Sequence, residues 1–326
     1  MSLPNESAQA DATNGRYASP KPSFDLEPQL DVVDTQVHVF NRLGTSGRPL
    51  DLPAALGAMD ALGVTSVIID EFWSPDADGH TLPGHAVAGG SFRPTCPGAE
   101  LASMLYPDRF SIMLRVNHDD PGLDAILYSF AAKPGARAIR LDARTPAQIA
   151  ALRSGGFERA FHNAQRLGLV VCVLSYGQAP QLAPYLEKFR NVTVILDHCG
   201  LVGIDPPEVL RSRDEGVPEP PPPCSFEDLL DLADLHPNLA LKWVHGPRVF
   251  ADPSYPFESV TAQLGRAVKV FGRERVMWGS DTTAVAPGFY TWAQALFYVR
   301  HASTLSAEDK EWVLGKSARA LYGWPR

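Results

Sequence analysis

The chain has 326 residues, a length that fits one large domain or two medium ones. Hydrophobic residues make up 45% and charged residues 20% of it, which is typical of a globular protein and excludes disorder throughout. The 37 acidic residues outnumber the 29 basic ones and no Lys/Arg run occurs, so we expect no nucleic-acid partner. The apolar stretches are much shorter than the roughly 18 residues of a membrane span, so we expect no membrane partner.

No secretory signal is visible at the N-terminus, and we expect a cytoplasmic protein. The four cysteines form no C-x-x-C pair and are expected to be reduced thiols.

Residues 1–29 are rich in Ser, Asn, Ala, Pro and Asp without apolar periodicity, which predicts a flexible N-terminal tail. From residue 30 to 326, short β-branched runs alternate with stretches of helical apolar spacing. The runs predict eight strands: Asp31–Phe40, Val64–Glu71, Phe110–Val116, Ala136–Leu141, Leu169–Ser175, Val192–His198, Ala240–Val244 and Arg275–Asp281. The stretches predict helices in Leu52–Leu62, Ala99–Tyr106, Pro146–Leu167, Ala179–Phe189, Phe226–Leu235 and Phe257–Phe271. Thr145-Pro146 and Ser225 supply N-terminal caps.

Eight strands alternating with helices predict an α/β fold, a single-domain (β/α)8 TIM-type barrel over residues 30–326. A doubly wound open sheet is the alternative, but no G-x-G-x-x-G follows any predicted strand. Two insertions, at about 74–97 and 203–224, follow the second and sixth strands. They leave the strand ends at which barrel enzymes build active sites, so they are either substrate-covering loops or surface elaborations, including an oligomer contact.

Ionisable side chains gather at the predicted strand ends. Asp34, Gln36 and His38 are expected to share one face of the first strand, and His198 and Asp281 close the sixth and eighth on their inward faces. A single histidine at a strand end is more often structural. The coincidence of His38, His198 and Asp281 at one rim favours an active site.

Three phrases carry a family resemblance: Asp34-Thr35-Gln36-Val37-His38, Leu196-Asp197-His198-Cys199-Gly200 and Trp278-Gly279-Ser280-Asp281. In this order they resemble the amidohydrolase-related family of the amidohydrolase superfamily, from about residue 31 to residue 324. The resemblance implies a distorted (β/α)8 barrel. It also implies one of the family's activities, which include decarboxylation of aromatic or muconic acids, carbon-carbon bond hydrolysis, hydration and lactone hydrolysis.

This chain departs from the family pattern at the positions that bind metal in metal-dependent relatives. Metal-dependent relatives have His-x-His on strand one, a histidine at the end of strand five and an aspartate on strand eight. This chain has Gln36 in place of the first histidine, and its fifth strand ends in Ser175-Tyr176-Gly177. An amide is a poor zinc ligand, so we expect no metal and no other cofactor, with zinc as the alternative. The chain is closer in character to metal-independent lactonases such as pyrone-dicarboxylate lactonase and sulfomuconolactone hydrolase.

Roles follow for the candidate residues. Asp281 is the expected general base, and His198 and His38 are expected to donate to a substrate carbonyl oxygen. A buried arginine needs a partner, and a substrate carboxylate suits its bidentate geometry. The expected substrate-binding residues are Gln36, Arg115, Arg140, Tyr176, Lys242, His245 and Arg248.

The first hypothesis is therefore a metal-independent hydrolase that opens a lactone or related ester of a small carboxylated ring compound in aromatic-compound catabolism. A metal-dependent decarboxylase or carbon-carbon bond hydrolase is the second, and a non-catalytic ligand-binding barrel is the third. The expected partner is a small anionic organic substrate, and a homo-oligomer is possible.

Overall fold

The computed structural model describes residues 30–40, 50–71, 73–76, 79–81, 83–202, 217–252, 254–282 and 290–325. The predicted tail at 1–29 and residues 203–216 of the second predicted insertion lie outside this part of the chain.

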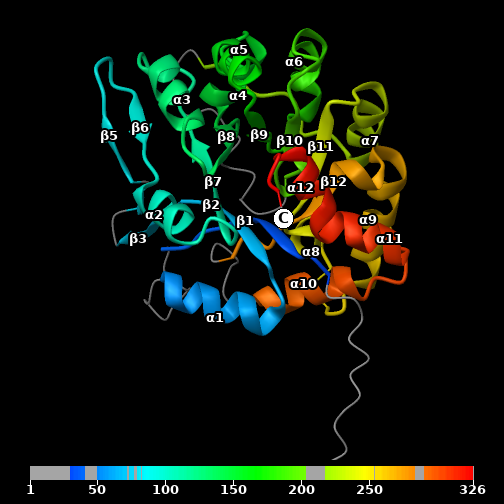
Figure 1. Ribbon diagram of the computed structural model, residues 1–326. Coiled ribbons are helices and arrows are strands. Elements are labelled where there is room, and N and C mark those ends of the chain that lie inside the picture. Colours follow the sequence, from blue (N-terminus) through cyan, green and yellow to red (C-terminus); the bar gives the residue numbers. More distant parts are fainter. Residues whose placement is uncertain are drawn as a thin grey trace, which may run out of the picture.

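Eight parallel strands form one sheet in chain order, each hydrogen-bonded to the next (Figure 1). Its strands are β1 (Val33–Val37), β2 (Ser66–Asp70), β7 (Phe110–Arg115), β8 (Ala136–Asp142), β9 (Val170–Leu174), β10 (Val194–Leu196), β11 (Leu239–Trp243) and β12 (Val276–Trp278). Each overlaps a predicted strand, and the predicted (β/α)8 barrel is confirmed.

The barrel closes where β1 meets the end of β12. The backbone N–H of Asp281 donates to the carbonyl of Gln36 at 2.9 Å, and the N–H of His38 donates to the carbonyl of Thr282 at 2.5 Å. Gly279 allows this close approach, since a Cβ there would lie 2.9 Å from Thr35 Oγ1. Residues predicted to form the site therefore also make the seam of the barrel.

Helices surround the strands. They are α1 (Leu52–Leu62), α2 (Pro97–Leu105), α3 (Leu123–Ala131), α4 (Pro146–Arg153), α5 (Glu158–Leu167), α6 (Ala183–Lys188), α7 (Phe226–Leu235), α8 (Gly246–Val249), α9 (Glu258–Phe271), α10 (Trp292–Arg300), α11 (Ala307–Glu311) and α12 (Ser317–Leu321). The predicted stretch Pro146–Leu167 is interrupted at Gly155, whose φ of +87° ends α4. The expected caps Thr145 and Ser225 both form capping boxes, which satisfy backbone N–H groups at the helix starts.

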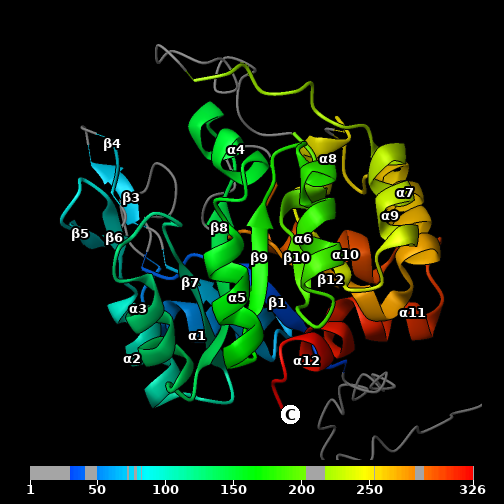
Figure 2. The same cartoon turned by 90° about the horizontal axis from the view of Figure 1, so that it is seen from above.

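Two apolar cores hold the barrel together. The inner core contains Met113, Ala138 and Met277 and is closed by Tyr322 and Trp324 from the C-terminal segment. Figure 2 shows the barrel from the side, with α12 and the C-terminus at one end and α4 at the other. The outer core lies between the strands and the helices. The C-terminal segment therefore fills the end of the barrel opposite the predicted site.

The prediction that alternate residues of each strand point into the barrel was wrong for β1 and β10. The register of β1 shifts between Asp34 and Val37, so Asp34 turns away from the interior and accepts a hydrogen bond from Trp292 Nε1 on α10. In β10 it is Ile195 that lies in the inner core, whereas Leu196 packs in the outer one. His198 therefore reaches the interior through a turn of the backbone and not by continuing an inward face.

The predicted insertions contribute short structured pieces at the mouth. Residues within 74–97 belong to two hairpins, β3 (Trp73–Asp76) with β4 (Gly79–Thr81) and β5 (Gly84–Ala86) with β6 (Phe92–Pro94). Residues 217–224 are anchored to the segment after β9, where Gln178 Nε2 donates to the carbonyl of Pro221 at 2.9 Å. Among the described helices none is long and apolar enough to cross a membrane.

Candidate active site

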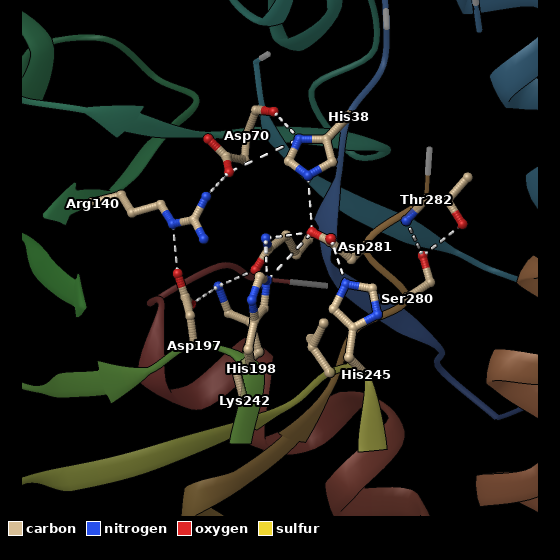
Figure 3. Close-up of polar contacts among 12 residues, drawn as sticks. His38, Asp70, Arg140, Asp197, His198, Lys242, His245, Ser280, Asp281 and Thr282 are labelled. Atoms are coloured by element: carbon tan, nitrogen blue, oxygen red, sulfur yellow. Dashed lines mark hydrogen bonds and ion pairs between the residues drawn. The ribbon is translucent and has the colours of Figure 1, made fainter. Parts of the chain in front are cut away.

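One buried carboxylate, that of Asp281 after β12, receives hydrogen bonds from side chains at the ends of β1 and β11 (Figure 3). Its Oδ1 accepts from Nε2 of His38 at 2.8 Å and from Nε2 of Gln36 at 2.5 Å. Its Oδ2 accepts from Nε2 of His245 at 2.7 Å, and Nε2 of His198 lies 3.6 Å from Oδ1. We call Asp281, Gln36, His38, His198 and His245 the Asp281 cluster. A carboxylate has about four acceptor positions, so these contacts leave room on Oδ2 for one more donor.

The backbone is strained where the cluster is built. Tyr176, His198, His245 and Asp281 follow four adjacent strands, and all adopt left-handed φ angles between +51° and +58°. Each such residue other than glycine costs about 1–2 kcal/mol. Four such costs at one rim are typical of a functional site, where geometry is selected over stability.

Lys242 fixes the orientation of the Gln36 amide. Its Nζ lies 3.4 Å from Gln36 Oε1, and an ammonium can only donate. The Gln36 Nε2 therefore faces the cluster, where it contacts Asp281 and also lies 3.2 Å from His198 Nε2. The first strand thus offers the cluster an N–H donor and no lone pair.

A chain of buried ion pairs lies beside the cluster. Lys242 Nζ lies 2.7 Å from Asp197 Oδ1, and Arg140 Nε lies 2.6 Å from Asp197 Oδ2. Arg140 Nη1 pairs in turn with Asp70, whose carboxylate also accepts from Arg115 Nε and Nη2 at 2.7 and 2.6 Å. The charges alternate along this chain, so each buried ion is compensated by a neighbour.

The ion pairs determine which groups are charged. Burial by itself would raise the pKa of Asp197, but Lys242 and Arg140 lower it to about 2. Burial would likewise lower the pKa of Lys242, but Asp197 outweighs it and the pKa is raised. Lys242 therefore remains an ammonium and is neither a base nor a nucleophile at neutral pH.

The histidines of the cluster differ in charge. Burial lowers the pKa of His198 to about 4 against the attraction of Asp281, so its ring is neutral at neutral pH. His38 contacts two acceptors, the Asp281 carboxylate and the carbonyl of Asp70, at 2.8 and 2.7 Å. Burial opposes its charge, but Asp281 and Asp70 raise its pKa. Burial would raise the pKa of Asp281 itself, but the three histidines hold it well below the usual value.

The expectation for the arginines needs a correction. The sequence argument gives a substrate carboxylate as the partner of Arg140 and Arg115, whereas the structure pairs both with protein carboxylates. Nη2 of Arg140 has no hydrogen-bond partner among the described residues. Arg140 and Arg115 line a pocket at the strand ends together with Asn117, His118 and Asp142. A substrate-binding role for both arginines stays a prediction.

Tyr176 and Arg248 are the remaining predicted residues. Tyr176 follows β9, and its side chain is buried. Arg248 lies in α8 just after His245, close enough to Tyr290 to lower the pKa of its hydroxyl, although burial raises that pKa more. The structure leaves their expected roles as predictions.

Sequence reasoning missed three residues at the site. Asp70 ends β2 two positions after Ile68, which lies in the inner core, so alternation could have found it. Asp197 stands within the phrase that carries the family resemblance. Tyr290, whose hydroxyl lies 2.5 Å from His245 Nδ1, has no signal in the sequence because only the fold brings it there.

The cluster also has the donor types of a metal site. His198, His245 and Asp281 each offer a ligand atom, and these atoms lie within 4.8 Å of one another. Imidazole and carboxylate are suitable zinc ligands, so these three residues could hold a divalent ion. The set differs from the family pattern, because His245 comes from strand seven and Gln36 faces the cluster with an N–H donor.

Residues 101–324 match the model of a protein family described as Amidohydrolase. The chain belongs to the amidohydrolase family. It is thus an enzyme of the amidohydrolase superfamily, as the motifs on strands one, six and eight predicted. No curated protein matches the sequence.

Solved structures share the fold at low identity. A probable 2-pyrone-4,6-dicarboxylic acid hydrolase from Acinetobacter baumannii, with citric acid bound, is 16% identical, with a TM-score of 0.59 over 90% of this chain and 100% of that one. A putative hydrolase of the same acid from Pseudomonas putida is 19% identical, with a TM-score of 0.62 over 91% and 99%. A zinc-bound amidohydrolase from Burkholderia multivorans is 16% identical, with a TM-score of 0.63 over 90% and 100%. The shared fold therefore includes at least one protein with bound zinc.

The ion pairs predict that the protein loses stability in acid. Asp197 has a pKa of about 2 in the folded chain and an ordinary value near 3.8, so it stabilises the fold above that value. The difference corresponds to about 2 kcal/mol, which is lost as the pH falls from about 4 to about 2. We expect urea denaturation to show a steeper loss of unfolding free energy across this window in wild type than in Asp197→Asn. Parallel curves for the two proteins would contradict the assignment.

Proposed function

We propose that the enzyme hydrolyses a lactone or related ester of a small carboxylated ring compound, with Asp281 as general base and no essential metal. The observation that supports this most is the Asp281 carboxylate, which is held by N–H donors on both oxygens and has room for one more donor on Oδ2. A water hydrogen-bonded there would have its proton acceptor already in place.

In the proposed reaction the water oxygen bonds to the ester carbonyl carbon as Asp281 takes a water proton. The carbonyl becomes an oxyanion, and its collapse breaks the ring carbon-oxygen bond. The leaving oxygen then recovers the proton from Asp281, so the enzyme returns to its starting state. No other reactant is required.

Neutral His198 is the proposed donor to the carbonyl oxygen. Its side chain is 11% exposed, which makes it more accessible than His38 at 3%. Both ring nitrogens of His38 already contact protein oxygens, so its proposed role is to hold Asp281 and to contribute positive charge. This changes the role expected for His38 but keeps it in the site.

Arg140 is the proposed anchor for the substrate carboxylate. Its guanidinium is held rigid by Asp197 and Asp70, and Nη2 remains available for a charge-assisted hydrogen bond. Arg115, Tyr176 and Arg248 are proposed to complete the pocket. A carboxylated ring compound of the kind met in aromatic catabolism would fit this combination of charges.

A metal-dependent decarboxylase or carbon-carbon bond hydrolase is the second candidate. It is favoured by the convergence of His198, His245 and Asp281, and a dihydroxybenzoic acid decarboxylase from Polaromonas with bound manganese shares the fold at 12% identity and a TM-score of 0.58. A bound divalent ion would lower the pKa of a water or polarise a carbonyl. Against it, the Gln36 amide turns an N–H toward the cluster, and the Lys242 ammonium lies directly behind it.

Metal content separates the two candidates. For protein purified without added metal, we expect far less than one equivalent of zinc by elemental analysis, and lactone hydrolysis that survives a chelator. The reason is that Gln36 and the Ser175-Tyr176 pair remove two imidazoles from the family's ligand set. About one equivalent of tightly held zinc, with activity restored only by metal, would establish the second candidate.

Arg140→Met should weaken the binding of anionic substrates. The lost charge-assisted hydrogen bond corresponds to roughly 1.5–3 kcal/mol, or a rise in KM of about 10- to 150-fold. Arg140 also holds Asp70 and Asp197, so the melting temperature is measured alongside, and Arg140→Lys serves as the control that keeps the charge. We expect the KM of an uncharged ester analogue to change much less; equal changes for both substrates would remove Arg140 from the binding site.

Asp281→Asn should affect kcat far more than KM. The asparagine keeps one oxygen for His38 and Gln36 but cannot take a proton, so we expect kcat to fall at least about 100-fold. Asp34→Asn is the matched control, because Asp34 is equally buried at the same seam and accepts the backbone N–H of Ser280 at 2.9 Å. The control should lose stability without a comparable loss of kcat. A folded and fully active Asp281→Asn would show that another group is the base.

A further inference from the structure

The pocket at the strand ends contains a carboxylate as well as arginines. Asp142 ends β8 two positions after Arg140, so the two side chains lie on the same face of the strand, and both line the pocket with Arg115. The cations nearest to Asp142 Oδ2 are Arg115 Nη1 at 3.4 Å and Arg144 Nη2 at 3.6 Å, which are long ion-pair distances. Asp142 Oδ1 is buried and has no hydrogen-bond partner among the described residues.

The Asp142 side chain carries a negative charge. Burial by itself would raise its pKa, but Arg144, Arg115 and Arg140 outweigh burial and lower the pKa, so the group is ionised at neutral pH. Its contacts are longer than those of Asp70, which accepts from Arg115 Nε and Nη2 at 2.7 and 2.6 Å. The charge of Asp142 is therefore offset less completely than that of its neighbour.

The ion pairs around the pocket leave room for one further anion. In the part of the chain that the structure describes, the linked cations are Arg115, Arg140, Arg144 and Lys242, and the linked carboxylates are Asp70, Asp142 and Asp197. Asp281 is not counted, because the N–H donors of its cluster offset its charge. Four cations against three carboxylates leave an excess of one positive charge. The donor that an anion can reach is Arg140 Nη2, because Arg140 is 2% exposed and its Nε and Nη1 are already held by carboxylates.

We propose that Asp142 is a specificity-determining residue that restricts the pocket to ring compounds with a single carboxylate. That carboxylate pairs with Arg140 and uses the excess positive charge. A second carboxylate on the same ring would lie against Asp142 without a cation of its own, and like charges repel strongly where water is largely excluded. The inference rests on the proposed function for the carboxylated ring, and it narrows that class to monocarboxylates.

The binding of two probe anions tests this role without turnover. Benzoate has one carboxylate, and isophthalate has a second one on the same ring. By isothermal titration calorimetry we expect wild type to bind benzoate at least about tenfold more tightly than isophthalate, on the scale of one repulsion between charges. Asp142→Asn keeps the shape and removes the charge, so isophthalate should bind to it about as tightly as benzoate. Asp142→Glu keeps the charge and should keep the preference for benzoate.

Asp31→Asn is the matched control for the change in net charge. Asp31 precedes β1 and therefore lies at the opposite end of the barrel from the pocket. It pairs with Arg319 Nε at 3.0 Å, and its side chain is 14% exposed, close to the 19% of Asp142. This variant should keep the wild-type ratio of the two dissociation constants.

Arg144→Met tests the charge count from the opposite sign. The Arg144 side chain is 40% exposed, so the variant is expected to fold normally. Removing this cation takes away the excess positive charge, so benzoate should bind about threefold more weakly, on the scale of an exposed charge.

Equal or tighter binding of isophthalate by wild type overturns the proposal, as does an unchanged ratio in Asp142→Asn or an equal change in Asp31→Asn. Benzoate binding that is absent, or that Arg140→Met leaves unchanged, overturns it as well. If Asp142→Asn does not fold, unchanged benzoate binding in Arg144→Met decides against the proposal instead. If wild type opens no ring lactone, the proposed function fails, and the dissociation constants of the two probes still decide the charge selectivity of the pocket.

Discussion

The structure of the barrel mouth depends on one constraint, the near-complete burial of a carboxylate. Asp281 is nearly fully buried, and a buried charge is tolerated only when it is paired and hydrogen-bonded. Its donors come from the end of β1 and from the turn after β11, while its own backbone N–H closes the barrel against Gln36. The residues that hydrogen-bond the buried carboxylate therefore include those that close the barrel.

The same constraint explains the buried ions around it. The buried Lys242 ammonium needs an opposite charge nearby, which Asp197 supplies. Arg140 and Asp70 extend this row of alternating positive and negative charges. Breaking one of these salt bridges would leave a buried ion unpaired. The result is a rigid polar layer that holds Arg140 in place and orients Gln36.

The left-handed turns place polar side chains at the mouth at a cost in local backbone stability. Glycine would adopt these φ angles without strain, whereas His198, His245 and Asp281 adopt them with side chains that meet at the mouth. The inner core and the C-terminal residues that fill the far end supply the compensating burial. A stable barrel with a strained rim is consistent with a catalytic role for that rim.

The sequence by itself determined the strand count, the order of elements and the rim to which the key residues belong, because periodicity and strand-end position are local properties. It also gave the family, through phrases on strands one, six and eight. It could not give the bulge in β1 that turns Asp34 outward, the pairing of Arg140 with Asp70 and Asp197, or the contact of Tyr290 with His245. These depend on which side chains the closed barrel brings together from distant positions. Only the tertiary structure decides which charged side chains pair with one another. The reason is that the fold determines which charges are buried, and each buried charge needs a partner to offset its desolvation.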